Sequence, residues 1–158
     1  MAKLSAGLLL FRGAGSGPLE VLLVHPGGPL WATRDEGAWS IPKGEVDDDD
    51  AAVTAEREFT EELGSSPPAG ARIDLGQIVQ KGGKRVHAWA VAGDLDTASV
   101  RSNTFEMQWP PRSGRIMTFP EIDRAAWLDL AAARVKVLEA QTPFLDRLVD
   151  ALAGGGRR

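Results

Sequence analysis

The most informative segment of the chain is WSIPKGEVDDDDAAVTAEREFTEELG, residues 39–64. Residues 39–41 predict a short strand that runs into a turn. The acidic residues 47–50 supply carboxylates, which accept hydrogen bonds from the free N–H groups at the start of a helix. We therefore predict a helix over 51–63. Gly64 follows directly, where a glycine commonly ends a helix in the left-handed conformation.

Three glutamates of this helix point the same way on a helical wheel that advances about 100° per residue: Glu58, Glu61 and Glu62. A neighbouring apolar stripe can face the core; it consists of Ala52, Ala55, Phe59 and Leu63. Carboxylates at this spacing repel one another by roughly a few tenths of a kcal/mol per pair. Arg57 could pair with Glu61, and a divalent cation would neutralise more. Mg²⁺ and Mn²⁺ prefer such oxygen ligands.

Charge is distributed unevenly along the chain. The net charge is −4, from 18 basic and 22 acidic residues, which disfavours a general nucleic-acid binder. Residues 44–62 hold nine of the acids and one base, so the remaining chain carries a net charge of +4. Such an acidic run is either a solvated helix face or a cation-binding surface. Charge alone leaves both interpretations open.

Composition limits the class of protein. The 158 residues, 43% hydrophobic and 25% charged, are typical of one globular domain. The absence of cysteine excludes disulfides, thiolate catalysis and cysteine-ligated metals, and two histidines are too few for a histidine-rich metal site. No apolar run approaches the roughly 20 residues that span a bilayer, and the N-terminus does not have the pattern of a secretory signal. We therefore expect a cytoplasmic enzyme or binding domain.

Strands dominate the chain outside the acidic helix. We predict strands over 3–12, 19–25, 73–81, 85–92, 104–109 and 126–128, a loop over 112–124, and helices over 130–138 and from Thr142 onward. Thr142 is the expected N-cap of the last helix, with Pro143 in its first turn. This order favours an α+β layered fold. We expect a single domain over 1–153 and a flexible tail over 154–158.

The stretch from Gly44 to Gly64 resembles the Nudix box, whose pattern is Gly, five residues, Glu, seven residues, and Arg-Glu-hydrophobic-x-Glu-Glu-x-Gly-hydrophobic. Its second half matches from Arg57 to Gly64. Its first half departs from the pattern, because twelve residues separate Gly44 from Arg57 where the box has thirteen. The mid-box Glu is missing, so Asp49 or Asp50 must take its place. Ser65 occupies the final hydrophobic position.

The resemblance implies a Nudix-type α/β/α sandwich with a mixed central sheet and a MutT-like activity. Members of this family use Mg²⁺ or Mn²⁺ and water to cut a phosphoanhydride bond in a nucleoside diphosphate linked to another moiety. By position, the metal ligands would be Glu58, Glu61, Glu62 and the Lys43 carbonyl, with Arg57 orienting the carboxylates. A further carboxylate often assists as ligand or base; Glu121 is the first candidate and Glu106 the second, and each could also be an ordinary surface glutamate.

The substrate stays open among nucleotide sugars, dinucleoside polyphosphates, oxidised nucleoside triphosphates and diphosphoinositols. The sequence Pro-Lys-Gly at 42–44 is frequent in Nudix members that resemble diadenosine-polyphosphate and diphosphoinositol-polyphosphate hydrolases. Lys43, Lys81 and Arg112 are candidate phosphate contacts, although the last two also suit solvated turns. Specificity should lie in residues 26–38 and 100–124. One of the five tryptophans could stack on a base, or all could lie in the core.

Two other functions compete with hydrolysis. The first is a Nudix-fold regulatory domain that binds a nucleotide without turnover, which the shortened box would favour. The second is a purely structural module, which would leave the acidic helix without a role. The expected partner in every catalytic case is a small diphosphate. We expect no association with a membrane and no stable nucleic-acid partner. The resemblance to the Nudix family makes a homodimer a reasonable expectation.

Overall fold

The central sheet is built around β1 (Leu4–Arg12), whose apolar centre is buried on both faces. The computed structural model describes residues 3–15 and 17–155. β1 runs parallel to β5 (Arg85–Ala92) and antiparallel to both β2 (Glu20–Pro26) and β3 (Lys43–Glu45). The strand order is β4-β5-β1-β2-β8, with β4 (Ile73–Val79) and β8 (Ile122–Asp129) at the ends. β1 and β2, which follow each other in the sequence, form an antiparallel pair.

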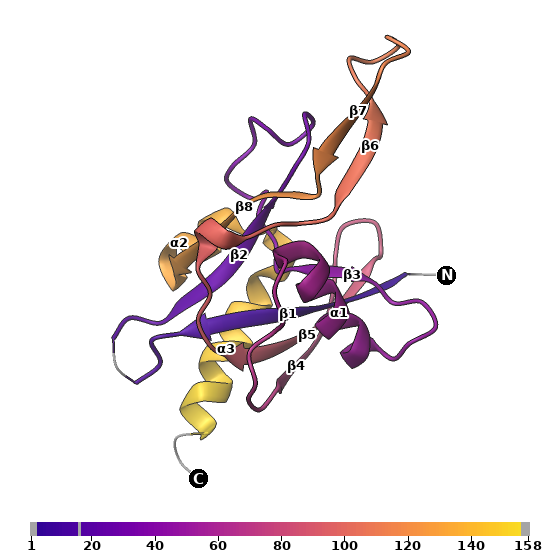
Figure 1. Cartoon of the computed structure of the whole chain (residues 1–158). Helices are drawn as coiled ribbons and strands as arrows, with labels where there is room; N and C mark the ends of the chain where they lie inside the picture. Colours follow the sequence, from indigo (N-terminus) through magenta and orange to yellow (C-terminus); the bar gives the residue numbers. More distant parts are fainter. Residues whose placement is uncertain (1–2, 16, 156–158) are drawn as a thin grey trace.

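Helices cover both faces of this mixed sheet (Figure 1). On one face, α1 (Ala51–Leu63) packs through Phe59 against side chains of β1 and β2. On the other face, α2 (Leu130–Lys136) and α3 (Thr142–Gly155) close a second core that includes Phe144, Leu145 and Leu148. Successive β1 residues point to opposite faces, so Leu8 and Leu10 serve the first core and Leu9 the second. The predicted α/β/α sandwich with a mixed central sheet is confirmed.

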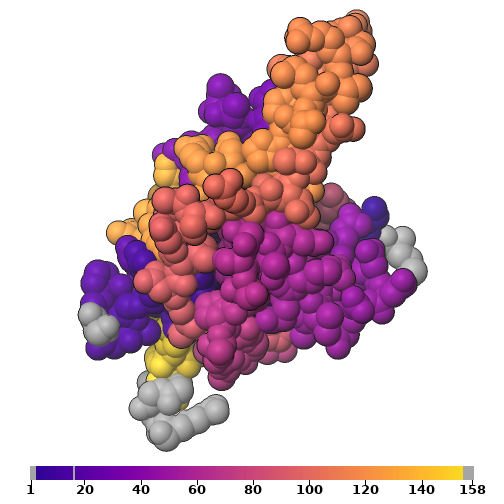
Figure 2. All heavy atoms as spheres, viewed as in Figure 1, coloured from indigo at the N-terminus to yellow at the C-terminus, as the bar shows by residue number. Residues whose placement is uncertain are grey.

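A separate hairpin, β6 (Thr104–Gln108) and β7 (Ile116–Pro120), projects from the sandwich (Figures 1 and 2). The predicted loop over 112–124 is therefore wrong in part, because β7 pairs with β6 and β8 already begins at Ile122. Apolar side chains alternate with polar ones along β6, which is the period of a strand. The remaining elements are short 3-10 turns at Thr97–Ser99 and Glu139–Gln141.

Three smaller predictions also need correction. Residues 39–41 make only isolated bridges, Val24 with Ser40 and Trp39 with Val137, because this segment crosses between the sheet and the α2 end. Thr142 is already helical, and its hydroxyl donates to the Glu139 carbonyl instead of accepting as an N-cap. The last helix extends through Gly154 to Gly155, so only 156–158 of the predicted tail remain, and these lie outside the described residues. No helix within 3–15 or 17–155 is long and apolar enough to cross a membrane.

Candidate active site on helix α1

The orientation of the acidic helix is determined by its caps and its buried face. The Asp50 carboxylate accepts a hydrogen bond from the Val53 N–H (2.8 Å), and Gly64 ends the helix at φ 79°. Phe59 is fully buried against the sheet. Because the helix is fixed by its apolar stripe, the glutamates on the adjacent stripe are directed toward β3 and the loop before β8.

Gly44 is the point of closest approach between β3 and the helix. A Cβ atom added at Gly44 would lie 2.0 Å from Glu58 Cδ and 2.1 Å from Glu58 Oε1. Any side chain here would displace the Glu58 carboxylate. The glycine of the box therefore provides the space that the first of the three glutamates occupies.

The backbone of Lys43 faces the helix. Pro42 O accepts from Leu8 N and Val46 N donates to Leu4 O, so these residues hydrogen-bond toward β1. In an antiparallel strand the intervening odd-numbered positions turn their N–H and C=O groups the other way. Accordingly Lys43 N donates to Glu62 Oε1 at 3.3 Å, and the Lys43 carbonyl lies on the same side of the strand. This position is consistent with the expectation that the Lys43 carbonyl and the glutamates bind the same cation.

Arg57 connects several carboxylates of the site. Its guanidinium donates to Asp49 Oδ2 at 2.9 Å and lies 3.8 Å from Glu58 Oε2 and 3.9 Å from Glu61 Oε2. The two aspartates that could replace the missing mid-box Glu thus have different roles: Asp49 pairs with Arg57, whereas Asp50 caps the helix. The shortened loop therefore still supplies an acidic partner for Arg57.

The carboxylates of this face are held close enough to repel one another. Burial, together with the neighbouring Glu61, raises the pKa of Glu58 to about 7. Burial and repulsion from Glu58 raise the pKa of Glu62 to about 8, although the Lys43 N–H opposes the shift. Glu121 adds to the repulsion at both glutamates, so it faces the same site from outside the helix. Glu58, Glu61, Glu62 and Glu121 therefore lie near enough to influence one another's charge, and their roles in catalysis stay a prediction.

Glu121 lies between β7 and β8, where backbone hydrogen bonds fix the chain. Its N–H donates to Asn103 O (2.9 Å) and its carbonyl accepts from Gly27 N (2.8 Å). The alternative candidate, Glu106, is exposed on β6 opposite Thr118. It takes no part in the cluster on α1. Of the two candidates, Glu121 is the one that borders the cavity beside Glu62, and its assisting role stays a prediction.

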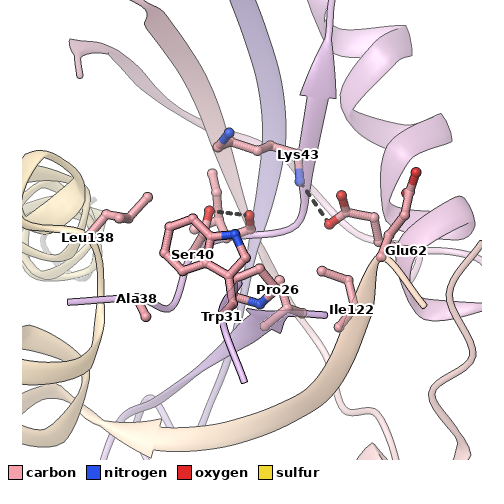
Figure 3. A pocket seen from close by; sticks show the side chains of 11 residues that line it. Pro26, Trp31, Ala38, Ser40, Lys43, Glu62, Ile122 and Leu138 are labelled. Atoms are coloured by element: carbon pink, nitrogen blue, oxygen red, sulfur yellow. Dashed lines mark hydrogen bonds between the residues drawn. The ribbon is translucent and has the colours of Figure 1, made fainter. Parts of the chain in front are cut away.

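A cavity of about 220 Å³ opens beside Glu62 and Glu121 (Figure 3). Its walls include Trp31, Ser40, Ile41, Ile122 and Leu138. The Lys43 side chain also borders it but points away from Glu62, while the Lys43 backbone nitrogen points toward that carboxylate. Burial lowers the pKa of the Lys43 ammonium. Lys43 is the basic residue of the lining, and Glu62 and Glu121 are its acidic residues.

A second cavity, of about 250 Å³, shares Pro26, Trp31 and Glu121 with the first. Its other walls come from the segment 27–30 and from Phe105 and Met107 on β6. Sequence reasoning assigned specificity to both segments but missed these individual residues. The alternating Phe105, Met107, Met117 and Phe119 around the Pro110-Pro111 turn are the signal that would have indicated the hairpin.

The other two predicted phosphate contacts lie at turns. Lys81 is exposed at the tip between β4 and β5, where it borders a third hollow together with Gln80 and Glu139. Arg112 is exposed at the tip between β6 and β7, with a left-handed φ of 62°. The structure does not bring either residue into the cluster on α1. Their contact with phosphate stays a prediction.

His25 holds the loop before Ala38 in place. It is fully buried, with Nδ1 2.8 Å from Asp123 Oδ1 and Nε2 2.6 Å from Arg34 O. The loop is fixed further by Asp35, which accepts from Trp39 Nε1 and pairs with Lys136. Because Trp31 belongs to this loop, the network helps to set the shape of both cavities.

The chemistry of the donor set fits a divalent cation. Glutamate and carbonyl oxygens are the ligands that Mg²⁺ and Mn²⁺ prefer, and repelling, part-buried carboxylates need positive charge nearby. Gly44 leaves room for Glu58 to lie against the Lys43 strand. Within the described residues, no three acidic or histidine side chains already surround one point. The carboxylates must therefore adjust their rotamers around an ion.

Comparisons with known proteins agree with this geometry. The family model described as NUDIX domain matches residues 1–152. No curated protein matches the sequence significantly. Among solved structures, the chain is similar to an Ap4A hydrolase from C. elegans, with a TM-score of 0.67, 22% identity, and 95% of this chain and 98% of that chain covered.

Two further solved structures share the fold. One is the NUDIX domain of Shewanella oneidensis NrtR complexed with ADP ribose (TM-score 0.62, 16% identity, 96% and 89% covered). The other is a MutT protein from Methanosarcina mazei Go1 (TM-score 0.60, 20% identity, 95% and 94% covered). Identities this low establish similarity of fold, whereas the family match extends over nearly the whole sequence. The chain therefore belongs to the Nudix family.

Proposed function

We propose that this protein uses Mg²⁺ or Mn²⁺ to hydrolyse a phosphoanhydride bond in a nucleoside diphosphate linked to another moiety. Water adds to one phosphorus, and the bridging oxygen leaves with the other phosphate. The observation that carries the proposal is the convergence of Glu58, Glu61, Glu62 and Glu121 beside the Lys43 backbone. This oxygen-rich cluster borders a cavity of a size suited to phosphate groups.

The acidic site cannot bind a polyanionic substrate unaided. Glu58, Glu61, Glu62 and the Lys43 carbonyl would hold the cation. A bound divalent cation would supply positive charge to the phosphate oxygens and would lower the pKa of the attacking water. The protein's own contribution is to hold these carboxylates on one face of α1 beside the backbone of Lys43 and Gly44.

Other side chains would orient the carboxylates and exclude bulk water from the site. Arg57, between Asp49 and Glu61, keeps the carboxylates in register on the helix. Glu121 is our candidate for accepting the proton of the attacking water, because it reaches the cluster from a different element. Apolar walls such as Ile122 would exclude bulk water from the reacting phosphate.

The similar structures support a nucleotide rather than another diphosphate. One of them is an Ap4A hydrolase, and another holds ADP ribose. Both compounds named there are nucleoside diphosphate derivatives. We therefore place dinucleoside polyphosphates and ADP-ribose-type compounds first among the substrates to be examined. The cytoplasmic location and the homodimer expected from the sequence stay predictions.

The test is metal-dependent cleavage of a panel of nucleoside diphosphate derivatives with Mg²⁺ or Mn²⁺, followed by chromatography as the formation of phosphate-ester products such as a nucleoside monophosphate. We expect turnover by the wild type and a loss of at least about a hundredfold in Glu62→Gln, which removes one charge at nearly constant shape. Glu121→Gln should also lose activity, whereas Glu106→Gln, with the same chemical change on exposed β6, should keep it. Equal activity of Glu62→Gln and wild type would contradict the proposal.

A nucleotide-binding domain without turnover is the second candidate. It is favoured by the one-residue shortening of the box and by the NrtR domain, which was solved with bound ADP ribose. Absence of metal-dependent hydrolysis, together with a rise in thermal stability on adding ADP-ribose, would support this function instead. Intact Glu58, Glu61 and Glu62 argue against it.

A further inference from the structure

The β6–β7 hairpin has one apolar and one mainly polar face. Phe105 pairs with Phe119 and Met107 with Met117, and side chains of paired residues share a face. The intervening positions form the other face: Thr104, Glu106, Gln108, Ile116, Thr118 and Pro120. The apolar side of such an amphipathic hairpin is expected to be covered by another group, because removing apolar surface from water lowers the free energy.

The apolar face is directed toward the chain segment after β2. A Cβ atom added at Gly28 would lie 2.8 Å from Phe105 Cζ, so the glycine allows this aromatic ring to approach the backbone. Phe105 and Met107 line the second cavity together with Trp31. The Phe105 and Phe119 ring centroids are 6.0 Å apart. Phe105 therefore contacts Gly28, and the cavity lies between the hairpin and residues 26–31.

The hollow remains open along part of its rim. Leu30, which is one of its lining residues, is 62% exposed. The hairpin itself stands out from the surface of the sandwich (Figure 2). An aromatic and sulfur-lined hollow that is still accessible can receive a planar apolar group, which aromatic rings contact by stacking or edge-on and sulfur contacts at the ring edge.

The size and position of the hollow define what would enter it. Its volume of about 250 Å³ is below the roughly 300–1,000 Å³ of sites that enclose a whole drug-sized ligand. One ring system would fit, and a whole dinucleotide would not. Glu121 borders both this hollow and the cavity beside Glu62. A ligand with a ring at one end and phosphates at the other could therefore occupy the two cavities together.

We propose that Phe105, Met107 and Trp31 form a subsite for the aromatic base of the substrate, so that the enzyme selects nucleoside diphosphate derivatives over diphosphates without a ring. The inference rests on the proposed function, since it assumes that the phosphates lie beside Glu62. It assigns substrate selection to the apolar face of the hairpin. Diphosphoinositols, which have no aromatic ring, are excluded as good substrates.

The test measures equilibrium binding of adenosine 5′-monophosphate, guanosine 5′-monophosphate and ribose 5-phosphate by intrinsic tryptophan fluorescence or calorimetry. We expect the wild type to bind at least one of the two nucleotides about tenfold or more tightly than ribose 5-phosphate, a size typical of base–aromatic stacking. Phe105→Ala should remove most of that difference. Phe105→Leu keeps an apolar side chain to pack the hairpin, and should also lose it if the ring face is what matters.

The control is Ile116→Ala, a truncation on the opposite face of the same hairpin, which should leave all three affinities unchanged. With a hydrolysed nucleotide, Phe105→Leu should raise KM about tenfold at nearly constant kcat. Equal wild-type affinities for nucleotides and ribose 5-phosphate, or an unaltered preference in both Phe105 variants, would overturn the proposal. Failure of the proposed function has a different signature: no metal-dependent turnover, while the nucleotide preference and its loss in Phe105→Leu persist.

Discussion

Helix α1 and the β6–β7 hairpin both face Glu121, but they are held in opposite ways. α1 is anchored by Phe59, which is fully buried. The hairpin projects from the sandwich, and its Ile116 is 62% exposed (Figure 2). The rigid element carries the carboxylates, whose geometry must be exact to a fraction of an ångström. The projecting element carries the apolar surface, which needs only the right shape and chemistry. In our proposal, α1 carries the reaction chemistry and the β6–β7 hairpin carries substrate selection.

The largest expected effect is on stability, and it separates the two regions. Phe59→Ala should lower the free energy of unfolding by about 3–5 kcal/mol, because it leaves a cavity between α1 and the sheet. Ile116→Ala on the hairpin should change it by less than about 0.5 kcal/mol, as is usual for an exposed side chain. Urea denaturation measures both. A similar loss in the two variants would mean that the hairpin is part of the cooperative core.

The next effect separates stability from activity. Gly44→Ala should reduce kcat about tenfold to a hundredfold, because the new Cβ would take the place of the Glu58 carboxylate. The displaced atoms are the end of a flexible side chain, so the melting temperature should change little. Gly154→Ala is the control, since an added Cβ there meets nothing within 4 Å. Full activity in Gly44→Ala would show that the position of Glu58 is not required.

The third effect is the dependence of stability on pH and metal. The pKa values of Glu58 and Glu62 are raised from 4.5 to about 7 and about 8, so the folded protein binds these protons more tightly than the unfolded chain. Without metal, the free energy of unfolding should therefore fall as pH rises from about 4.5 through about 8. Thermal melts at several pH values measure this.

Adding Mn²⁺ should restore stability at pH 8 and have little effect at pH 5, because protons compete with the cation for the same carboxylates. For a chain of this size, each kcal/mol regained corresponds to roughly 2–4 °C in melting temperature. Glu62→Gln should weaken both the pH dependence and the response to Mn²⁺. An identical response in wild type and Glu62→Gln would place the metal outside the acidic face of α1.

The smallest expected effect lies at the end of α1. Ser65 fills the position where the family pattern has a hydrophobic residue, and its hydroxyl is a buried polar atom without a hydrogen-bond partner among the described residues. Ser65→Ala should raise the free energy of unfolding by about 1 kcal/mol, because an unsatisfied buried hydroxyl is removed. Ser66→Ala, at the adjacent exposed position, should have no measurable effect. Destabilisation by Ser65→Ala would mean that the hydroxyl has a partner.

The same comparison explains what could be predicted from sequence. α1 was predicted correctly because its determinants are local: Asp50 caps it, Gly64 ends it, and Phe59 recurs on its apolar stripe. The hairpin was missed in part, because β7 is defined by pairing with β6 across a proline-containing turn. The alternation of apolar and polar side chains is visible over residues 104–108. The prediction nevertheless places residues 112–124 in a loop, with Arg112 as a candidate phosphate contact.

The two cavities could not be derived from local patterns. Both depend on Trp31, whose loop is fixed by the nearby His25 together with Asp123 and Lys136 from distant parts of the chain. The near contact of Gly28 with Phe105 is equally non-local. The sequence offers Glu121 and Glu106 as alternatives. The proximity of Glu121 to Glu62 depends on the positions of β7 and β8 in the fold.

The most direct test of the central claim is paramagnetic broadening of backbone amide NMR signals during titration with Mn²⁺. A Mn²⁺ ion on the acidic face of α1 should broaden the signals of Gly44, Glu58 and Glu62 first. The hairpin tip around Gly114, which projects away from α1 (Figure 1), should keep its signals, and Glu62→Gln should suppress the broadening at low Mn²⁺. Broadening that begins at the hairpin tip, or that is the same in Glu62→Gln, would contradict the assignment of the metal to α1.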